Sequence, residues 1–130
     1  MAFSLDDVAQ AEANLRAARV RAVAREAPDT RNKTEREYGA RLEARKLAGE
    51  IVSYAYEAVT LKLAFDLRYT PDYLVICADG TVEFHECKGA HIWDDGRDKL
   101  KTAARLFPWF VFFRAQKKDG RWTVREVKTW

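Results

Sequence analysis

The hydrophobic positions at the start of the chain are mostly small side chains. From Ser4 to about Glu26 the sequence is rich in Ala and Arg and contains neither Gly nor Pro, a composition that favours a helix. Ser4 has the side chain of an N-cap, and Pro28 ends the segment. Because alanines bury little surface, we expect residues 1–30 to form a peripheral or partner-facing helical extension of a main domain at residues 31–130.

A second helix is predicted from Asn32 or Thr34 to Gly49. Tyr38 and Leu42, four residues apart, form an apolar seam along it. After Gly49 the hydrophobic residues recur at every second position, which is the period of a strand. The predicted strands in this part of the chain are Ile51–Glu57, Val59–Leu63, Tyr69–Cys77 and Val82–Lys88.

Turn signals and one more helical pattern organise the rest of the chain. Asp79-Gly80 predicts a hairpin with a two-residue turn, of the type I′ kind, between the last two of these strands. A third helix is predicted to open at Asp94-Asp95-Gly96 and to end at about Phe107. The apolar run Trp109–Ala115 predicts a strand buried on both faces, and Trp122–Lys128 predicts a final strand after another Asp-Gly turn. The predicted element order is therefore α-α-β-β-β-β-α-β-β.

Charge is distributed unevenly along this pattern. The net charge is only +3, but residues 69–93 carry four acids against one base, whereas residues 94–130 carry ten bases against five acids. An acidic block suits a hard cation, and a basic flank suits a polyanion. Random scatter of surface charge is the alternative interpretation at this point.

Several protein classes are excluded by the composition. No apolar run approaches the ~20 residues of a membrane span, and the first residues lack the pattern of a signal peptide. The two cysteines, Cys77 and Cys87, are too few for a disulfide framework and are not spaced as in a zinc ribbon. We therefore expect no membrane partner and a reducing, cytoplasmic location.

The segment from Tyr69 to Gly89 contains the candidate chemistry. Along a strand Val82–Lys88, Glu86 and Lys88 point to one face, whereas His85 and Cys87 point to the other. The predicted hairpin brings Asp72 to the end that carries Glu86 and Lys88. Carboxylate oxygens are the ligands that Mg²⁺ prefers, and an ammonium group can orient a water or stabilise charge on a phosphate. This combination predicts hydrolysis of a phosphodiester.

These residues resemble the PD-(D/E)XK nuclease superfamily, with Pro71-Asp72 as the PD element and Glu86-Cys87-Lys88 as the ExK element. The segments YTPDYLV, EFHECKG and WDDGRDKLK resemble one branch of it, the phage endonuclease I-like Holliday-junction resolvases and related uncharacterised phage and prophage proteins. The resemblance covers Asn32 to about Phe113. It implies an α/β (α+β) fold with a restriction-endonuclease-like core, in which helices flank a mixed central β-sheet.

The resemblance also implies a function and a set of site residues. The function is that of a Mg²⁺-dependent DNA endonuclease acting on branched or structured DNA in phage DNA processing, with Mn²⁺ able to substitute and with the bacterial host cytoplasm as the location. Its catalytic residues are Glu35, Asp72, Glu86 and Lys88, of which the three acids are the metal ligands. Glu35 stands in Asn32-Lys33-Thr34-Glu35, where the branch has Lys or Ser first. Glu37 is the competing third carboxylate, on a different face of the helix.

Basic residues around this site are candidates for contacts with DNA phosphates. They are Lys33, Arg97, Lys99, Lys101, Arg105, Lys117 and Lys118. Lys101 is preferred to Lys99 because it lies nearer the sheet-facing side of its helix, and a solvated basic surface is the alternative for all of them. His91 and Trp93, in the loop after the ExK element, are weighed as phosphate and base contacts against ordinary surface and core roles.

Partners and rival functions follow from the same expectation. Resolving a four-way junction needs two symmetric nicks, which predicts a homodimer with the N-terminal helix as a candidate contact. A phage or host replication or recombination protein is a possible further partner. One rival function is a nuclease that acts on linear duplex, flaps or ends. The other is a non-catalytic DNA-binding protein that keeps the nuclease fold.

Overall fold

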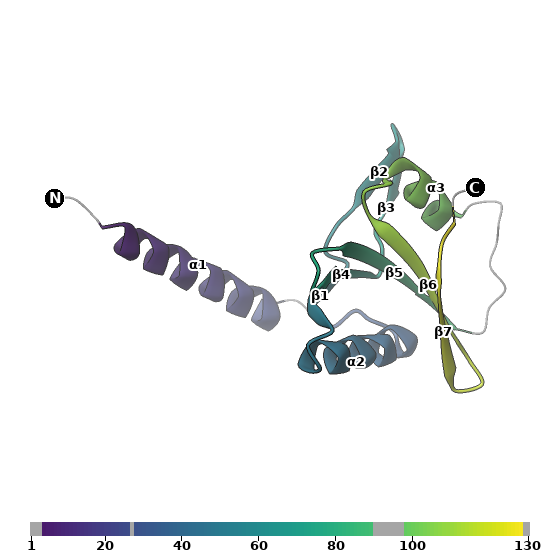
Figure 1. Cartoon of the computed structure of the whole chain (residues 1–130), viewed down its shortest axis with the longest axis horizontal. Helices are drawn as coiled ribbons and strands as arrows, with labels where there is room; N and C mark the ends of the chain where they lie inside the picture. The colour runs from purple at the N-terminus through teal and green to yellow at the C-terminus, as the bar shows by residue number, and fades with distance from the viewer. Residues whose placement is uncertain (1–3, 27, 90–97, 129–130) are drawn as a thin grey trace. The chain divides into compact units, whose positions relative to one another are not determined.

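The computed structural model describes residues 4–26, 28–89 and 98–128. It divides the chain into two compact units, Met1–Thr30 and Arg31–Trp130 (Figure 1). This division falls at the boundary expected from the sequence. Within the described residues, no helix combines the length and the apolar character that crossing a membrane requires.

The N-terminal unit contains one helix, α1 (Leu5–Glu26). Its cap is the expected one, because the Ser4 hydroxyl accepts a hydrogen bond from the Asp7 N–H at 3.1 Å and the Asp7 carboxylate accepts one from the Ser4 N–H at 3.1 Å. The larger apolar side chains described on α1 are exposed, with Leu5 at 89% and Leu15 at 53%. Within the N-terminal unit, these apolar side chains of α1 are therefore not covered.

The second unit is built on a mixed five-stranded sheet in the order β1-β4-β5-β6-β7. Its strands are β1 (Ile51–Tyr56), β4 (Tyr73–Cys77), β5 (Val82–Lys88), β6 (Val111–Lys118) and β7 (Arg121–Glu126). β5 and β6 are parallel, whereas the other neighbours are antiparallel. Parallel neighbours need a long crossover, and the chain segment between them includes α3 (Lys99–Leu106). The expected α+β fold with a mixed central sheet is thus confirmed.

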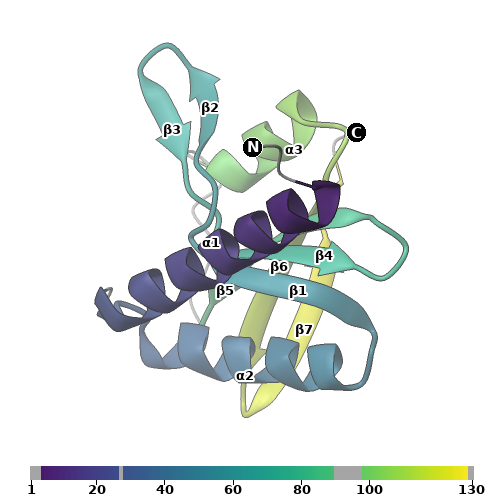
Figure 2. The same ribbon diagram turned by 90° about the vertical axis from the view of Figure 1, so that its left-hand side faces the viewer.

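Two hydrophobic clusters hold helices to opposite faces of this sheet (Figure 2). On one face, Tyr38 and Leu42 of α2 (Lys33–Leu47) pack against Tyr73, Val75 and Cys87 of the sheet. This is the apolar seam that the sequence predicted for the second helix. Gly49, with a φ of +79°, follows the helix where its end was expected.

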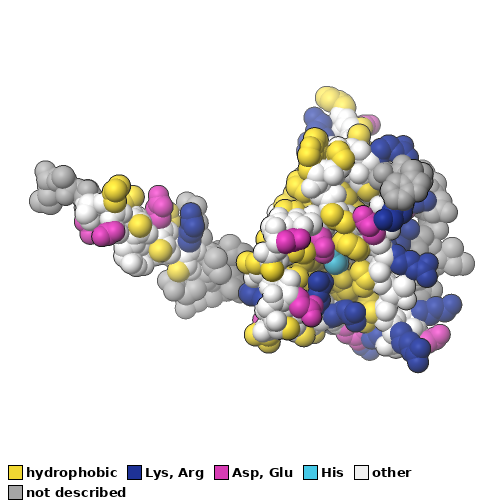
Figure 3. All heavy atoms as spheres, in the orientation of Figure 1, with side chains coloured by type: hydrophobic (Ala, Val, Ile, Leu, Met, Phe, Trp, Pro, Cys, Tyr) yellow, Lys and Arg dark blue, Asp and Glu magenta, His cyan; other side chains and the backbone are white. Residues whose placement is uncertain are grey.

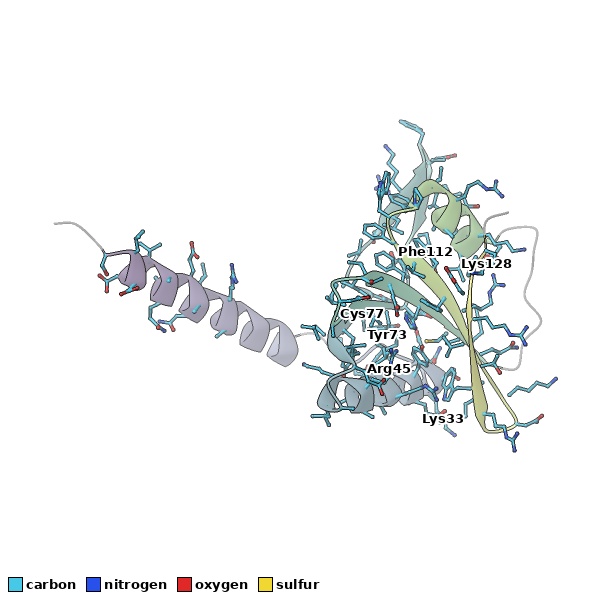
Figure 4. All side chains as sticks on the ribbon, in the orientation of Figure 1. Lys33, Arg45, Tyr73, Cys77, Phe112 and Lys128 are labelled. Carbon is cyan, nitrogen blue, oxygen red and sulfur yellow. The ribbon has the colours of Figure 1, made fainter. Side chains whose placement is uncertain are left out.

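The opposite cluster joins α3 to the other face. Leu100 and Ala103 of α3 pack against Phe84 and Phe112 of the two parallel strands. Figure 4 shows Phe112 on the α3 side of the sheet and Tyr73 on the α2 side. Because successive strand residues alternate between faces, β5 contributes Phe84 to one cluster and Cys87 to the other.

A short second sheet differs from the sequence prediction. Instead of one strand at Val59–Leu63 and one unbroken strand at Tyr69–Cys77, the chain forms a hairpin of β2 (Leu61–Ala64) and β3 (Leu67–Tyr69) ahead of β4. Its turn, Phe65-Asp66, contains no glycine, so the usual hairpin signal is missing from the sequence. Pro71, which has no N–H to donate, lies in the break between β3 and β4.

Two further boundaries are corrected. The predicted helix start at Asp94-Asp95-Gly96 lies outside the described residues, and α3 is capped by Asp98, whose carboxylate accepts a hydrogen bond from the Lys101 N–H at 3.2 Å. β6 begins at Val111, so Trp109, which was expected in a doubly buried strand, is 75% exposed. The predicted turn after β6 is present, and its two residues Asp119 and Gly120 both have positive φ, of 52° and 74°.

Candidate active site

The β4–β5 hairpin brings the PD and ExK elements to one end of the sheet. Tyr73 is paired with His85 in the antiparallel register, so the preceding residue, Asp72, lies beside the end of β5. The Asp72 Oδ2 accepts a hydrogen bond from the Cys87 N–H at 2.8 Å. The Asp72 carbonyl in turn accepts one from the Glu57 N–H at 2.8 Å, at the end of β1. Backbone pairing alone therefore places Asp72 next to the ExK residues.

Burial and like charge oppose the ionisation of the two carboxyl groups. Burial, followed by the charge of Glu86, raises the pKa of Asp72 to about 7, against the lowering by the Cys87 N–H and by Lys88. Burial also raises the pKa of Glu86, against the lowering by the Tyr69 hydroxyl and by Lys88. The site thus concentrates negative charge that a nearby cation would stabilise.

Lys88 belongs to the same cluster. It lies two residues after Glu86 on β5, so both side chains project from the same face of the strand. Its side chain is only partly exposed, and its charge lowers the pKa of both Asp72 and Glu86. The expected convergence of two carboxylates and one ammonium group is therefore present in the structure.

Glu35 approaches the cluster from α2. It is 8% exposed, and its charge raises the pKa of both Asp72 and Glu86. Its carboxylate has two local partners: Oε1 accepts a hydrogen bond from the Asn32 N–H at 3.0 Å, and Oε2 accepts one from the Tyr56 hydroxyl at 2.8 Å. The Asn32 side chain completes a capping box by accepting from the Glu35 N–H. Glu37, the competing candidate, forms an ion pair with Lys117 of β6.

Sequence reasoning missed two tyrosines that hold the acids in place. The buried Tyr69 of β3 donates a hydrogen bond to Glu86, and Tyr56 of β1 donates one to Glu35. Burial, and then the adjacent carboxylate, raise the pKa of both phenols, so both stay protonated donors. The strand pattern does not single out these two residues, because the alternation does not show which polar atom a hydroxyl will meet.

The carboxylate oxygens of this cluster are ligands of the type that a hard cation binds. Among the described residues, no group of three or more His, Cys, Asp or Glu side chains is arranged to hold a metal ion, and each acid of the cluster is held by a protein donor. The cluster nevertheless offers only oxygen ligands, which Mg²⁺ prefers. Its carboxylates also destabilise one another's charged form, which a divalent cation would relieve.

The two residues expected to face away from the acids have structural roles. Cys87 is buried in the α2-side cluster, and burial raises the pKa of its thiol. The His85 ring is 2% exposed, with its Nδ1 at 2.6 Å from the Tyr38 hydroxyl and its Nε2 at 2.9 Å from the Glu83 carboxylate. His91 and Trp93 lie outside the described residues.

A basic groove lies beside the Glu86 and Lys88 end of β5. Figure 3 shows that Lys and Arg side chains gather on the right-hand side of the second unit in this view. It has a volume of about 580 Å³ and is formed by α3, β6 and β7, together with Val127 and Lys128, which follow β7. Its basic lining residues are Lys101, Arg114, Lys118, Arg125 and Lys128. The groove adjoins the candidate site, because Arg114 is paired with Glu86 and Gln116 with Lys88 in the parallel register of β5 and β6.

The predicted DNA-contacting residues are spread over several surfaces. Lys101 and Lys118 line the basic groove, whereas Lys99 donates a hydrogen bond to the Arg68 carbonyl at 2.9 Å. Lys33 and Lys117 line a second, smaller hollow of about 290 Å³ beside Gly89. Arg105 is exposed in the last turn of α3, and Arg97 lies outside the described residues.

Three comparisons with known proteins bear on identity. Searches of protein-family models, of curated proteins and of solved structures found no match to this chain. The resemblance to PD-(D/E)XK nucleases therefore rests on the sequence of this chain alone.

Proposed function

We propose that this protein is a metal-dependent DNA endonuclease that hydrolyses phosphodiester bonds, with Mg²⁺ as its cation and Mn²⁺ able to substitute. The observation that carries the proposal is the convergence of Asp72, Glu86 and Lys88 at one strand end, where burial raises the pKa of both acids and the charge of Glu86 adds to the rise at Asp72. A buried charge cluster of this kind costs stability, which favours a functional over a structural role.

Each residue of the cluster has a distinct role in this proposal. Asp72 and Glu86 would hold the cation, and Glu35 would join them by exchanging one of its hydrogen bonds. When bound, the cation supplies positive charge beside the scissile phosphate and lowers the pKa of water. Lys88 positions the attacking water and offsets negative charge that develops on the phosphate. Tyr69 keeps the Glu86 carboxylate in place through its hydrogen bond.

The basic groove supports DNA as the substrate. Its five Lys and Arg side chains are accompanied by one acid, Glu126, among the lining residues, and phosphate contacts from such residues dominate the affinity of proteins for DNA. The groove adjoins the Glu86 and Lys88 end of β5. A DNA strand bound there would present a phosphate to the acids.

The experiment that tests this function is cleavage of labelled DNA with Mg²⁺, with Mn²⁺ and with EDTA. A four-way junction, a flap and a linear duplex of the same sequence identify the preferred substrate, and we expect the branched junction to be cut fastest. Asp72→Ala and Lys88→Ala should lower the rate by at least about 100-fold, whereas the exposed control Lys46→Ala should cut like the wild type. Equal cutting by the wild type and both site variants would overturn the proposal. DNA binding without cutting would favour the non-catalytic alternative.

We further propose a homodimer as the form that resolves a junction, because two symmetric nicks need two active sites. The exposed Leu5, Val8 and Leu15 of α1 support this helix as the contact. Light scattering of the full chain should give twice the monomer mass without DNA, and that mass plus the mass of one junction with DNA. A monomer under both conditions would contradict symmetric resolution while leaving the nuclease proposal intact.

A further inference from the structure

The tip of the β2–β3 hairpin carries a large apolar side chain that the fold does not use. Phe65 is 91% exposed in the two-residue turn of this hairpin. Turns usually hold Gly, Asn, Asp or Pro, and an exposed Phe forgoes the free energy that its burial would provide. The position therefore points to an interaction outside the chain.

The two strands below this tip, β2 and β3, form a stalk that is packed firmly on the domain. Leu61, Leu63 and Tyr69 are buried in the same cluster as α3. The Lys99 ammonium donates a hydrogen bond to the Arg68 carbonyl at 2.9 Å, which fastens the hairpin to α3. Figure 2 shows the hairpin extending away from the five-stranded sheet beside α3. An aromatic ring on an anchored stalk loses little conformational freedom when it binds.

The same hairpin is connected directly to the candidate site. Tyr69, at its base, donates a hydrogen bond to Glu86, and Asp72 follows three residues later. Tyr69 follows Phe65 by four positions, so at ~3.3 Å per strand residue the tip lies at most about 13 Å from the base. That length corresponds to about four base steps at ~3.4 Å each.

The surroundings of the ring suit a nucleic acid. The Lys62 ammonium lies 5.8 Å from the centroid of the Phe65 ring, and Lys62 is paired with Arg68 across the hairpin. One cation therefore lies over the ring and a second stands opposite it in the hairpin ladder, with Asp66 as the acid of the turn. Aromatic side chains accompanied by cations bind bases by stacking while the cations contact phosphates, and apolar wedges of this kind open base steps.

We propose that Phe65 is an aromatic wedge that stacks on a base exposed at a DNA branch point and so sets the position of branched DNA on the acidic site. This inference rests on the proposed nuclease function and deepens it, because it assigns the recognition of branched over linear DNA to one hairpin.

The test compares Phe65→Ala with the wild type on a four-way junction that carries 2-aminopurine at the branch point, in EDTA so that binding is measured without metal. Phe65→Tyr retains a ring that can stack, and Trp109→Ala removes another exposed aromatic side chain of the same domain as a matched control. Because Phe65 is exposed, the melting temperature of Phe65→Ala should equal that of the wild type. We expect Phe65→Ala to weaken junction binding by about 5- to 150-fold, to alter the 2-aminopurine signal and to leave linear-duplex binding unchanged. Phe65→Tyr and Trp109→Ala should behave like the wild type.

Several results would overturn the wedge. Unchanged junction binding by Phe65→Ala would do so, as would an equal weakening on linear duplex or an equal effect of Trp109→Ala. If Phe65→Ala changes the oligomeric state of the protein in solution, Phe65 belongs to a protein contact instead. Mg²⁺-dependent cutting by the wild type separates the two proposals: if the wild type cuts and Phe65→Ala binds normally, only the wedge fails. If the wild type neither binds nor cuts DNA, both fail.

Discussion

The environment of Asp72 disfavours the ionised form of its carboxyl group. Burial and the nearby Glu86 raise its pKa to about 7, while the Cys87 N–H and Lys88 oppose that rise. A folded-state pKa above the ordinary 3.8 means that the folded protein holds this proton more tightly than the unfolded chain does. Without metal, the contribution of Asp72 to stability is therefore present below about pH 4 and is lost as the pH rises through about 7.

Asp72→Asn tests this conflict between stability and function. Asparagine keeps an oxygen that accepts from the Cys87 N–H but removes the charge. In EDTA we expect the variant to melt at a higher temperature than the wild type at pH 8, with a smaller difference at pH 5. In a separate assay with Mg²⁺, the variant should not cleave DNA at either pH value. A lower melting temperature at pH 8 would contradict the repulsion inferred here.

Tyr69→Phe tests how closely Glu86 must be held. The variant keeps the buried ring and removes only the hydroxyl that donates to Glu86. Removing the partner of a metal ligand typically costs about 10- to 100-fold in metal affinity or activity, and we expect a loss in that range, measured as the Mg²⁺ dependence of cleavage. Tyr54→Phe is the matched control, because Tyr54 donates to Glu43 of α2 at 2.6 Å. An equal loss in both variants would argue against a specific role for Tyr69.

At the scale of elements, the position of Glu35 depends on how closely α2 approaches the sheet. The Tyr73 hydroxyl donates to the Glu35 carbonyl at 2.7 Å and accepts from the Arg31 guanidinium at 3.3 Å. Gly39 lies against this contact, where an added Cβ would come within 2.5 Å of the Tyr73 hydroxyl oxygen. The missing side chain at Gly39 lets the first turns of α2 sit at the strand end.

Gly39→Ala should therefore destabilise the protein although alanine favours helix by about 1 kcal/mol. The new methyl group must displace the Tyr73 hydroxyl or the helix, and overpacking of this kind costs about 1–3 kcal/mol. Denaturant unfolding measures the net change. In a Tyr73→Phe background, which lacks the clashing oxygen, the same substitution should cost less. Equal costs in both backgrounds would mean that the clash is relieved elsewhere.

At the scale of the whole molecule, the net charge of +3 hides two opposed surfaces. The acids at the strand end form one, and the basic groove of α3, β6 and β7 forms the other. The parallel pairing of β5 with β6 makes them neighbours, because it sets Arg114 beside Glu86. This arrangement suits a cation and a phosphate backbone bound side by side.

Lys101→Ala tests the groove. Each phosphate contact contributes about one unit to the slope of log affinity against log salt concentration, so we expect this variant to bind every DNA substrate more weakly and with a slope smaller by about one. Lys46→Ala, at an exposed position of α2, should leave the slope unchanged. If Lys101→Ala also leaves it unchanged, the groove does not hold the DNA backbone.

Much of this structure follows from local patterns in the sequence. The caps of α1 and α2, the glycine turn of the β4–β5 hairpin and the alternation along β5 were all predictable, because caps, turns and strand faces depend on residues close together in the chain. Because the hairpin was predictable, the convergence of Asp72, Glu86 and Lys88 was predictable as well. The Phe65-Asp66 hairpin was not predictable, because its turn lacks the usual residues and its strands are stabilised by packing against α3.

Tertiary structure alone decided which groups surround the acids. The tyrosine donors come from β1 and β3, and Glu35 comes from a helix on the other face from α3. The basic groove also joins residues from distant segments. Such contacts depend on sheet order and on the close approach permitted at Gly39, which no local pattern encodes. The sequence by itself thus determined the candidate acids and lysine and their common strand end, whereas packing determined their hydrogen bonds, their burial and so the pKa shifts of the acids.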